Sequence, residues 1–537
     1  MTEQLEFDFI VVGAGSAGCV VANRLSANPN HRVAVLEAGG PDRSPWIHIP
    51  VGYFKTMGNP ATDWCYVTAP DPGLNGRSIK WPRGKTLGGS SSINGLLYVR
   101  GQPQDFNHWR QLGNAGWAWD DVLPLFKRAE NWEGGGDDVR GDGGPLSVSR
   151  NKVDRTIVSA WLEAAVAAGQ RWTDDYNQED QEGVSYFQMT MRNGVRCSSA
   201  AAYLKPVMGR QNLHVFTNAH SHKINIKDGR AVAVQAMIDG KLQTISARRE
   251  IILCAGAIGS PQLLMLSGVG AGEELHQHGI DVVRELPGVG KNLQDHLQAR
   301  PVYRCNANTI NTESRNPIRL VAMALQYAAR RSGPMAMAAS LGTGFLKTRP
   351  ELETPDIQYH IQPFSADNPA DGAHRFSAFT ASVLQLRPES TGYLTLVSSD
   401  PYDHPSIHPN YLATRTDCET LVAGIKMTRA ICRHEPVASL ITAEHAPGLG
   451  LAEDDEALLE WARNTATTIY HPTGTCKMGD DKMAVVDAKL RVHGVSGLRV
   501  ADASIMPTIT SGNTNAPTIM IGEKLSDLIR AEHGYMV

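Results

Sequence analysis

Apolar runs that end in glycine-rich turns are the clearest pattern along the chain. The first run, Phe7 to Val12, leads into the turn Gly13–Gly18 and predicts a buried strand followed by the start of a helix. The helix is expected from about Ser16 to Ala27, because the Asn28-Pro29 pair that follows disfavours helical backbone. A second apolar run, Val33 to Leu36, completes a strand–helix–strand unit.

The same order of elements returns near the middle of the chain. A buried strand, Glu250 to Leu253, meets a turn of small residues and then a helix with Pro261 in its first turn. This strand is expected to join the same sheet in parallel. Three alternating stretches before it predict a β-meander attached to that sheet: Leu213–Thr217, Lys223–Ile226 and Ala231–Ile238.

Between about residues 306 and 460 the pattern changes to mixed strands with several prolines. The stretch Val321–Ala339 is rich in alanine and methionine, and its methionines are interpreted as core filling. A short amphipathic helix is expected earlier, over Ile157–Ala168. The change of character predicts a second domain that caps the first.

Composition places the chain among ordinary globular proteins with more than one domain. It has 537 residues, of which 42% are hydrophobic and 20% charged, and a net charge of −4. A weak negative charge without a basic block gives nothing that attracts nucleic acid. Eight scattered cysteines without a CxxC pair argue against a disulfide framework or a zinc site, and they fit a reducing compartment such as the cytoplasm.

No membrane span is expected from the sequence. The acidic N-terminus runs straight into the first strand, which leaves no room for a signal peptide. Two uncharged runs, 251–272 and 503–522, are broken by glycine, proline and polar residues, so neither is expected to cross a bilayer. Peripheral contact with the inner face of a membrane stays open.

The Gly13–Gly18 turn also carries candidate chemistry. Gly13 permits the tight turn, Gly15 lets backbone N–H groups approach a pyrophosphate, and Gly18 lets the helix pack close to the strand. Glu37 lies 19 positions after Gly18 (37 − 18), where a carboxylate accepts hydrogen bonds from ribose hydroxyls and repels a 2′-phosphate. These features favour dinucleotide binding over an ordinary turn and argue against NADP. NAD and FAD both remain candidates.

The segment from Arg83 to Gly95 is dense in glycine and small hydroxyl residues. Such a backbone suits direct contact with a flat ligand, to which it donates N–H groups. The alternative is a flexible linker, but apolar residues within it, such as Leu87 and Ile93, favour a ligand-contacting loop.

The last part of the chain holds the candidate catalytic groups. The segment Ile469–Gly479 places His471 in a loop constrained by glycine and proline, and Leu498–Ser504 is a strand that ends in Asp502. After Ser511, polar residues, a proline and then an apolar face predict the start of a helix. The positive end of this helix is a suitable partner for a negative ligand atom.

These motifs, in this order, resemble the glucose–methanol–choline (GMC) family of FAD-dependent oxidoreductases. The resemblance rests on the GAGSAG turn with Glu37, on Gly84–Asn107 and Gly256–Gly270 as two family signatures, and on the HPTGTCKMG and GNTNAPT blocks. It runs nearly from end to end and implies FAD rather than NAD as the cofactor. The implied fold is an α/β FAD-binding (Rossmann-like, GMC type) domain plus an α+β substrate domain with an antiparallel sheet.

The implied FAD-binding domain is discontinuous. It is expected to comprise residues 1–155, 199–305 and 461–537, with residues 156–198 and 306–460 forming the substrate-binding domain. Residues from all three segments are expected to contact FAD: Gly13, Gly15, Ser16, Gly18, Glu37, Arg83, Gly84, Gly88, Ser91, Asn94, Gly95, Ser221, Ala255, Asp502, Ala503, Asn513, Thr514 and Thr518.

Two positions depart from patterns found in relatives. Some relatives attach FAD covalently through a histidine in the first signature, where this chain has Ile93 followed by Asn94. Neither side chain forms such a bond, so non-covalent FAD is expected. At the adenine-contacting position, where many relatives carry valine, the chain has Ser221.

By resemblance, the catalytic pair is His471 and Asn515. A neutral imidazole titrates in the range needed to take the hydroxyl proton while the α-carbon hydride passes to flavin N5. The Asn515 amide would donate to the developing alkoxide, and the helix start near Ala516-Pro517 would stabilise the reduced flavin. The other 17 of the 18 histidines and Cys476 are interpreted as structural, and no metal site is expected.

The sequence therefore predicts FAD-dependent oxidation of a primary alcohol, a small molecule, to the aldehyde. By resemblance, electrons pass to a quinone or another acceptor rather than chiefly to oxygen. Choline is the alternative substrate, while an FAD-containing hydroxynitrile lyase and a non-catalytic flavin-binding protein are alternatives of other classes. The choice of alcohol, of acceptor and of oligomeric state stays open.

Overall fold

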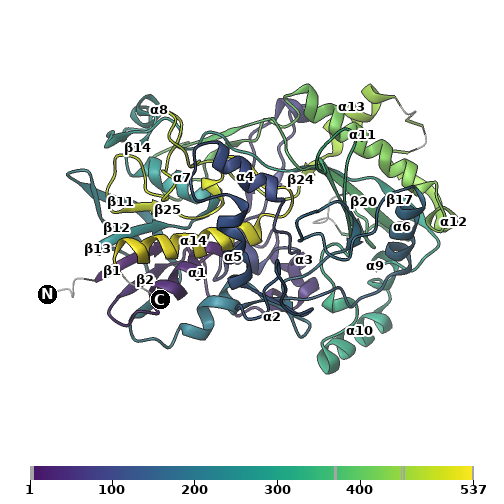
Figure 1. Cartoon of the computed structure of the whole chain (residues 1–537), viewed down its shortest axis with the longest axis horizontal. Helices are drawn as coiled ribbons and strands as arrows, with labels where there is room; N and C mark the ends of the chain where they lie inside the picture. Colours follow the sequence, from purple (N-terminus) through teal and green to yellow (C-terminus); the bar gives the residue numbers. More distant parts are fainter. Residues whose placement is uncertain (1–4, 368–371, 449, 452–453, 535–537) are drawn as a thin grey trace.

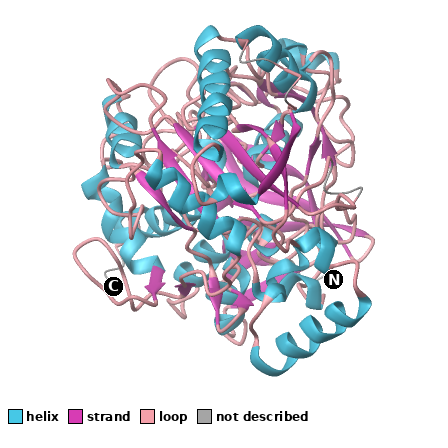
Figure 2. Cartoon of the chain, turned by 90° about the vertical axis from the view of Figure 1, so that its right-hand side faces the viewer, coloured by secondary structure: helices cyan, strands magenta, loops and turns pink. Residues whose placement is uncertain are grey.

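Two lobes, each built around one β-sheet, make up the protein (Figure 1), and the right-hand lobe faces the viewer in Figure 2. The computed structural model describes residues 5–367, 372–448, 450–451 and 454–534. Both ends of the chain lie in the left-hand lobe of Figure 1, and helices α9 to α13 lie in the right-hand lobe. The chain therefore passes from the first lobe into the second and returns.

A seven-stranded sheet forms the core of the first lobe. Its strands lie in the order β10-β2-β1-β13-β12-β11, with β25 paired to β13. Strands β10, β2, β1 and the end of β13 run parallel, whereas β13, β12 and β11 form an antiparallel meander. The predicted parallel strand at 250–253 is confirmed. The predicted meander is confirmed for 223–226 and 231–238, whereas 213–217 is corrected: it forms β10, which pairs in parallel with β2 at the opposite edge of the sheet. The strands are β1 (Glu6–Val12), β2 (Val33–Leu36), β10 (Leu213–Phe216), β11 (Ala219–Lys227), β12 (Arg230–Ile238), β13 (Lys241–Leu253) and β25 (Leu498–Val500).

Burial explains why β1 and β2 are apolar without alternation. Every residue of β2 is buried, and so is every residue of β1 except Glu6, because other elements cover both faces of a parallel sheet. Helix α1 (Ser16–Leu25) ends two residues before the predicted Ala27 and packs against α14 (Asn515–Glu532). Gly522 allows this contact, since a Cβ there would lie 2.9 Å from the Ala17 carbonyl oxygen.

An eight-stranded antiparallel sheet forms the second lobe, as the resemblance implied. Its order is β23-β17-β20-β19-β18-β7, and β16 pairs with both β20 and β24. The strands are β7 (Gly183–Tyr186), β16 (Leu297–Ala299), β17 (Val302–Cys305), β18 (Gly342–Leu346), β19 (Ile357–Gln362), β20 (Ala378–Gln385), β23 (Ile441–Ala446) and β24 (Thr467–Thr468).

Three strands of this second sheet fall outside the predicted substrate domain. Strands β16, β17 and β24 lie within segments 199–305 and 461–537, which the sequence assigned to the FAD-binding domain. Their pairing with β20, β23 and each other places them in the second lobe. Strands this short carry too little pattern to reveal which sheet they join.

Four helices pack together beside the second sheet (Figure 1). The predicted helix at 157–168 is confirmed as α6. The four are α6 (Thr156–Ala167), α11 (Arg415–Cys432), α12 (Val437–Leu440) and α13 (Asp455–Thr465).

Helix α10 (Pro317–Arg330) corrects the interpretation of the Ala/Met-rich stretch. Its one buried residue is Tyr327, whereas Ile318, Val321 and Leu325 are 80%, 59% and 65% exposed. Met337, which follows α10, is buried in the core of the second lobe. The first part of the stretch is therefore a surface helix rather than core filling, and α10 stands at the lower edge of the second lobe in Figure 1.

Shorter elements connect these parts. The helices are α2 (Pro45–His48), α3 (Tyr53–Thr56), α4 (Pro103–Gln111), α5 (Trp119–Ala129), α7 (Gly256–Leu266), α8 (Gly272–Gln277) and α9 (Ile310–Glu313). The strand pairs are β3 (Tyr66–Val67) with β4 (Lys80–Trp81), β5 (Glu130–Trp132) with β6 (Leu146–Val148), β8 (Met191–Arg192) with β9 (Val195–Arg196), β14 (Val269–Gly270) with β15 (Arg284–Glu285), and β21 (Tyr393–Thr395) with β22 (Ser406–His408).

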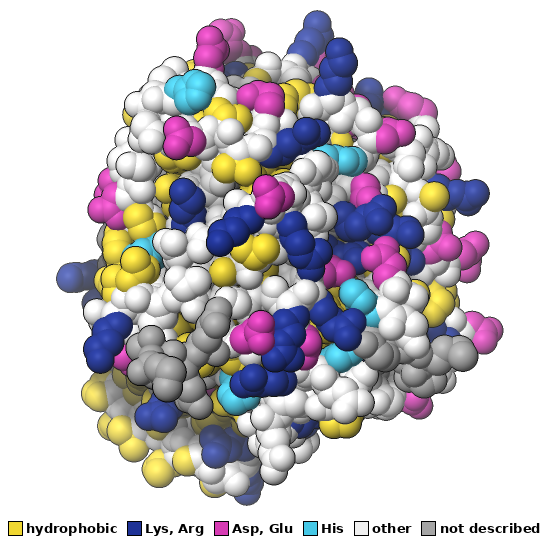
Figure 3. Space-filling model, turned by 90° about the vertical axis from the view of Figure 1, so that its left-hand side faces the viewer, with side chains coloured by type: hydrophobic (Ala, Val, Ile, Leu, Met, Phe, Trp, Pro, Cys, Tyr) yellow, Lys and Arg dark blue, Asp and Glu magenta, His cyan; other side chains and the backbone are white. Residues whose placement is uncertain are grey.

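The surface carries both signs of charge. On the face shown in Figure 3, Lys and Arg side chains intermingle with Asp and Glu, in keeping with the net charge of −4. All eight cysteines are free thiols. Among the residues described, no helix combines the length and the apolar character needed to cross a bilayer.

Candidate active site

A cavity of about 660 Å³ lies between the two sheets. Glu37 and Ser221 line it from the first sheet, and Gln298 and His360 line it from the second. The 83–95 loop, the loop around His471 and the start of α14 complete the wall. The cavity thus unites segments that lie far apart in the sequence.

The turn after β1 presents bare backbone to this cavity. Gly13 has a φ of +98°, and a Cβ there would lie 2.5 Å from the Cys254 carbonyl oxygen. A Cβ at Gly18 would lie 1.9 Å from the Gly13 carbonyl oxygen, so glycine is needed for α1 to pack here. Gly15 lines the cavity itself. A ligand can therefore approach the backbone of the turn without meeting a side chain.

Glu37 follows β2 and is buried beside the same turn. Its Oε2 accepts a hydrogen bond from the Ala14 N–H at 2.9 Å, and its Oε1 accepts from the Gly39 N–H at 2.8 Å. Burial raises the pKa of Glu37 to about 7, although these two hydrogen bonds act in the opposite direction. The carboxylate keeps lone pairs for further donors, such as the hydroxyl groups of a ribose.

The loop from Arg83 to Gly95 lies directly against the glycine turn. The Gly88 N–H donates to the Ala14 carbonyl at 2.7 Å. A Cβ at Gly89 would lie 2.8 Å from the Gly15 Cα, so the two backbones are in close contact. This packing holds the loop in place beside the cavity.

Most residues predicted to contact FAD line the cavity: Gly13, Gly15, Ser16, Glu37, Arg83, Gly84, Asn94, Gly95, Ser221, Ala255, Asp502, Ala503, Asn513, Thr514 and Thr518. Gly18, Gly88 and Ser91 are not among the residues that line it. The Ser91 hydroxyl donates to the Gly88 carbonyl at 2.6 Å and accepts from the Ser199 N–H at 2.9 Å. These three residues shape the wall from behind.

Asp502 and the start of α14 close the C-terminal side of the cavity. Asp502 Oδ2 accepts from the Gly256 N–H at 2.9 Å and the Ser260 hydroxyl at 2.6 Å, while Oδ1 accepts from the Ser504 N–H at 2.8 Å. Burial raises the pKa of Asp502. Residues 513–515, at the N-terminus of α14, line the cavity beside it. The first turn of a helix offers free N–H groups and the positive end of its dipole to a ligand.

His471 is held in the wall by Asp295 and His296, which immediately precede β16. Asp295 Oδ1 accepts from the His471 backbone N–H at 2.7 Å, and Oδ2 accepts from the hydroxyls of Thr468, at 2.6 Å, and Tyr411. His296 Nδ1 lies 3.0 Å from His471 Nδ1. The interpretation of His296 as a merely structural histidine is thereby corrected.

The hydrogen bonds determine which ring nitrogens carry protons. His296 Nε2 lies 2.9 Å from the Leu386 carbonyl oxygen, which can only accept, so this nitrogen carries the proton. Burial lowers the pKa of His296 to about 4, so the ring is neutral at pH 7 and its Nδ1 is an acceptor. His471 Nδ1 must therefore donate. A neutral His471 then carries a lone pair rather than a proton on Nε2.

Burial also lowers the pKa of His471 well below its usual value. The neighbouring His296 and His360, and the positive charge of Arg83, act in the same direction. His471 is consequently a neutral imidazole at pH 7 and able to accept a proton at Nε2.

Asn513 is the amide that faces this lone pair. Its Nδ2 lies 3.0 Å from His471 Nε2. Asn515, which was expected in this position, instead accepts a hydrogen bond from the Ser16 hydroxyl at 2.8 Å. Helix α14 begins at Asn515, so Asn513 lies in the preceding loop and its side chain takes a different direction. The geometry assigns to Asn513 the place that the sequence analysis gave to Asn515.

Comparison with known proteins agrees with this arrangement. The sequence profile of the GMC oxidoreductase family matches residues 7–298 and 388–522. The chain is 42% identical to choline dehydrogenase, mitochondrial, of Mus musculus, covering 98% of this chain and 89% of that protein. It is 42% identical to alcohol dehydrogenase [acceptor] of Pseudomonas putida, covering 97% and 95%. The solved structure of pyridoxine 4-oxidase from Mesorbium loti superposes with a TM-score of 0.89 at 30% identity, covering 99% of this chain and 100% of that one.

This chain belongs to the GMC oxidoreductase family. The resemblance seen in its motifs is confirmed, and so are the fold class, the FAD cofactor and a reaction that oxidises an alcohol. The cavity fits FAD: its floor is bare glycine backbone, and the buried Ser221 hydroxyl has no hydrogen-bond partner among the residues described. An orphaned polar group in such a wall is accounted for by a ligand that pairs with it.

Four polar residues of the second sheet also line the cavity of this GMC oxidoreductase: Gln298, Arg300, His360 and Gln362. The sequence analysis missed them. Each pair is spaced by two residues, Gln298 with Arg300 at β16 and His360 with Gln362 in β19, so both members lie on one face of the sheet. That spacing was the available signal, but it identifies a cavity only once the sheet is known.

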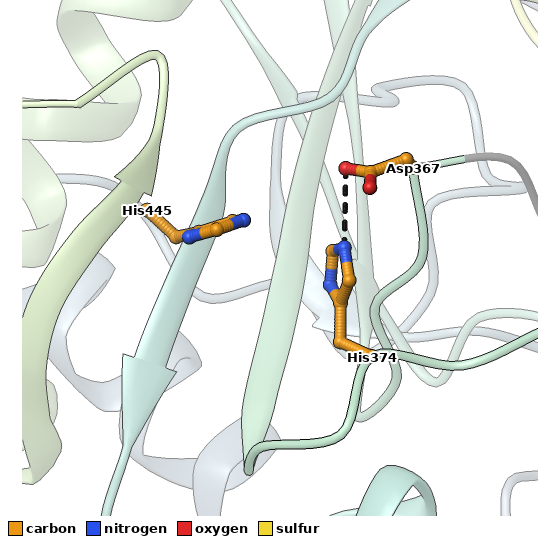
Figure 4. A group of neighbouring side chains, drawn as sticks. All are labelled: Asp367, His374 and His445. Atoms are coloured by element: carbon orange, nitrogen blue, oxygen red, sulfur yellow. Dashed lines mark ion pairs between the residues drawn. The ribbon is translucent and has the colours of Figure 1, made fainter.

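One group of possible metal ligands occurs among the described residues of this GMC oxidoreductase (Figure 4). Ligand atoms of Asp367, His374 and His445 lie within 4.8 Å of one another. Asp367 and His374 form an ion pair at 3.1 Å, with the Asp367 side chain 91% exposed. Burial, His374 and the nearby cation of Arg304 lower the pKa of His445, and the positive charge of Arg304 opposes a further positive ion. We therefore interpret this group as a surface ion pair beside a packed histidine.

Proposed function

We propose that the protein oxidises a primary alcohol to its aldehyde, with His471 as the base and Asn513 as hydrogen-bond donor to the alcohol oxygen. The observation that supports this is the hydrogen bond, 3.0 Å long, that Asn513 Nδ2 donates to the lone pair of His471 Nε2 in the cavity wall. An acceptor and a donor side by side suit a hydroxyl group, which donates to one and accepts from the other.

Proton removal is the step assigned to His471. The imidazole takes the hydroxyl proton at Nε2 while Nδ1–H remains bonded to His296, which keeps the ring oriented. As negative charge develops on the alcohol oxygen, the Asn513 amide stabilises it without a change of protonation. Gln358 Nε2, 3.4 Å from Asn513 Oδ1, supports the orientation of that amide.

FAD, when bound, supplies N5 as the acceptor of the hydride from the alcohol carbon. Gly15 and the start of α1 would hold its pyrophosphate, and Glu37 would accept hydrogen bonds from its ribose. The N-terminus of α14, around Thr514, would face the flavin ring and stabilise negative charge on it.

Anaerobic mixing of the flavoprotein with alcohols tests the proposal. Bleaching of the oxidised flavin absorbance, with stoichiometric aldehyde, is the expected result for short, long or aromatic alcohols. A hydroxynitrile lyase would cleave a cyanohydrin without bleaching, and a non-catalytic flavin-binding protein would be bleached by no alcohol. Either of the last two results would replace the proposal.

We further propose that the electrons pass to a quinone or another acceptor that is not oxygen, in line with the name of the Pseudomonas putida relative, alcohol dehydrogenase [acceptor].

We also propose a peripheral contact between α10 and an anionic lipid bilayer. Ile318, Val321 and Leu325 follow the i, i+3, i+7 spacing of one helix face and are all exposed. Residues 314–350 contain no Asp or Glu, while Arg315, Arg319, Arg330 and Arg331 surround the stripe. Exposed apolar side chains flanked by arginines match a membrane surface in both polarity and charge.

Vesicle sedimentation tests this contact. The holoenzyme should sediment with phosphatidylglycerol vesicles and much less with phosphatidylcholine vesicles. The double variant Ile318→Glu/Leu325→Glu should lose the binding. Leu242→Glu, which alters a 57% exposed leucine in the other lobe, should keep it. Equal sedimentation of all three proteins would exclude α10 as the contact.

A further inference from the structure

Arg300 is a half-buried cation in the part of the cavity that the second sheet lines. It follows β16 and lies in the cavity wall together with Gln298, His360 and Gln362. Its side chain has one protein hydrogen bond in the described structure, from Nη2 to Gln362 Oε1 at 3.3 Å. A guanidinium has five N–H donors and stays protonated inside proteins, so most of its capacity is left over.

Unpaired polar atoms are concentrated at this wall. Within the described residues, Arg300 Nε, Gln298 Oε1 and His360 Nε2 are buried and have no hydrogen-bond partner. Gln298 and His360 are 2% and 1% exposed. Burying a polar group without a partner costs about 1–3 kcal/mol, so three such atoms on one wall indicate a polar ligand.

The positive charge of the wall favours a ligand that carries a negative charge. No carboxylate of the described chain lies within 4.0 Å of the Arg300 guanidinium. The groups that influence its pKa besides burial are the neutral hydroxyls of Tyr470 and Tyr53. Arg83, a second half-buried cation of the cavity wall, donates from Nη2 to the Tyr470 carbonyl oxygen.

Asp295 and Asp63 stabilise the charge of Arg83, but no carboxylate is among the groups that influence the pKa of Arg300. Glu37 and Asp502 belong to the first lobe and accept backbone hydrogen bonds there. Asp63 accepts from the backbone N–H groups of Gly58, at 2.6 Å, and Arg83, at 2.8 Å. The wall around Arg300 is therefore electropositive.

We propose that Arg300 forms an anion-binding subsite for the substrate, so that the preferred alcohols carry a carboxylate or a similar anionic group away from the reacting carbon. The inference rests on the proposed alcohol oxidation and names its substrate class. A carboxylate pairs with the guanidinium fork in charge-assisted hydrogen bonds. A quaternary ammonium alcohol such as choline meets only repulsion from Arg300, in contrast to the substrate named for several relatives.

Matched substrates isolate the effect of charge. The test measures kcat/KM for ω-hydroxy acids from 4-hydroxybutanoate to 10-hydroxydecanoate and for 1-alkanols of equal chain length. It also compares choline with its neutral isostere 3,3-dimethylbutan-1-ol. In the wild-type holoenzyme kcat/KM should favour at least one hydroxy acid over its alkanol, and the neutral isostere over choline, by about tenfold or more in each case.

Three variants assign the preference to Arg300. Arg300→Gln should reduce the hydroxy-acid preference by about tenfold or more while changing kcat/KM for alkanols much less. Arg300→Lys keeps the charge and should retain part of the preference. Arg304→Gln removes an exposed arginine four residues further on and should behave as wild type.

A binding measurement separates this inference from the proposed function. Straight-chain carboxylates without a hydroxyl group should perturb the flavin spectrum of the holoenzyme and bind more weakly to Arg300→Gln by about tenfold or more. If alkanols bleach the flavin but choline equals or exceeds its isostere, or if Arg300→Gln leaves the preference unchanged, the subsite is wrong. If no alcohol bleaches the flavin, the proposed function is wrong. Carboxylate binding to the wild type and to Arg300→Gln still tests whether Arg300 binds an anion.

Discussion

The Nδ1 atoms of His471 and His296 lie 3.0 Å apart, and the direction of the hydrogen bond between them is determined by a third atom. Because His296 Nε2 donates to the Leu386 carbonyl, its Nδ1 can only accept. His471 is thereby held in the tautomer whose unprotonated Nε2 accepts a hydrogen bond from Asn513. A backbone carbonyl behind two rings thus prepares the proposed base for its role.

Replacing His471 by alanine removes the proposed proton acceptor. We expect His471→Ala to retain FAD and to show a rate constant for anaerobic flavin reduction roughly 100-fold lower or more. Stopped-flow absorbance at the flavin band measures this rate. His434→Ala, at an exposed histidine, is the matched control. Near-normal reduction in His471→Ala would remove this residue from the mechanism.

The lowered pKa of His471 predicts how flavin reduction depends on pH. A protonated imidazole cannot take a proton, and protonation of this ring begins only below the usual pKa of about 6.5. The rate constant at saturating alcohol should therefore stay level as the pH falls from about 9 to about 6.5.

His296→Ala should lower the rate constant for flavin reduction, because Nε2 of His471 is then free to carry the proton. His296→Asn, which offers Oδ1 near the lost Nδ1, should restore part of it. A wild-type rate that already falls between about pH 8 and 7 would contradict a neutral, buried base.

Two asparagines near the start of α14 should differ in effect. Asn513→Ala should slow flavin reduction by up to about 3 kcal/mol of transition-state stabilisation, because it removes the donor beside His471. Asn515→Ala should affect reduction less, since its amide accepts from Ser16 instead. Stopped-flow traces of both variants with one alcohol decide the matter. A larger loss in Asn515→Ala would return the role to that residue.

Glu37 should couple FAD affinity to pH. Burial raises its pKa to about 7, so the carboxylate form that accepts ribose hydroxyls is gained as the pH rises through that value. FAD binding to apoprotein, followed by fluorescence quenching, should therefore tighten from about pH 6 to about pH 8. Glu37→Gln should bind FAD more weakly at pH 8 and lose this dependence. Unchanged affinity in Glu37→Gln would contradict the ribose contact.

FAD should be released intact by acid or denaturant. Ile93 and Asn94 line the cavity where some relatives carry the histidine that bonds to the flavin, and neither side chain can do so. Trichloroacetic acid precipitation should leave a colourless pellet and all flavin in the supernatant. A yellow pellet would show a covalent bond at another residue.

Local patterns were sufficient for the first lobe. The apolar runs at 7–12 and 250–253 are strands because parallel strands are buried on both faces, and the glycines between strand and helix are required by backbone contacts. Strands β11 and β12, which precede β13 in the meander, could likewise be predicted from the alternation of apolar and polar residues. The second lobe was less so, because β16, β17 and β24 are too short to show which sheet they join.

By itself, the sequence determined the family, the cofactor and the general reaction. Short motifs specify the local backbone, and a buried strand is apolar whatever its place in the sheet, so both can be recognised without the tertiary structure. The tertiary structure decided which side chains meet. His296 and His471 are 175 positions apart, and Asn513 rather than Asn515 faces the imidazole because a helix begins between them. Arg300 became a candidate for substrate recognition only when strand order placed it in the cavity. Such contacts depend on strand order and side-chain direction, which no local pattern contains.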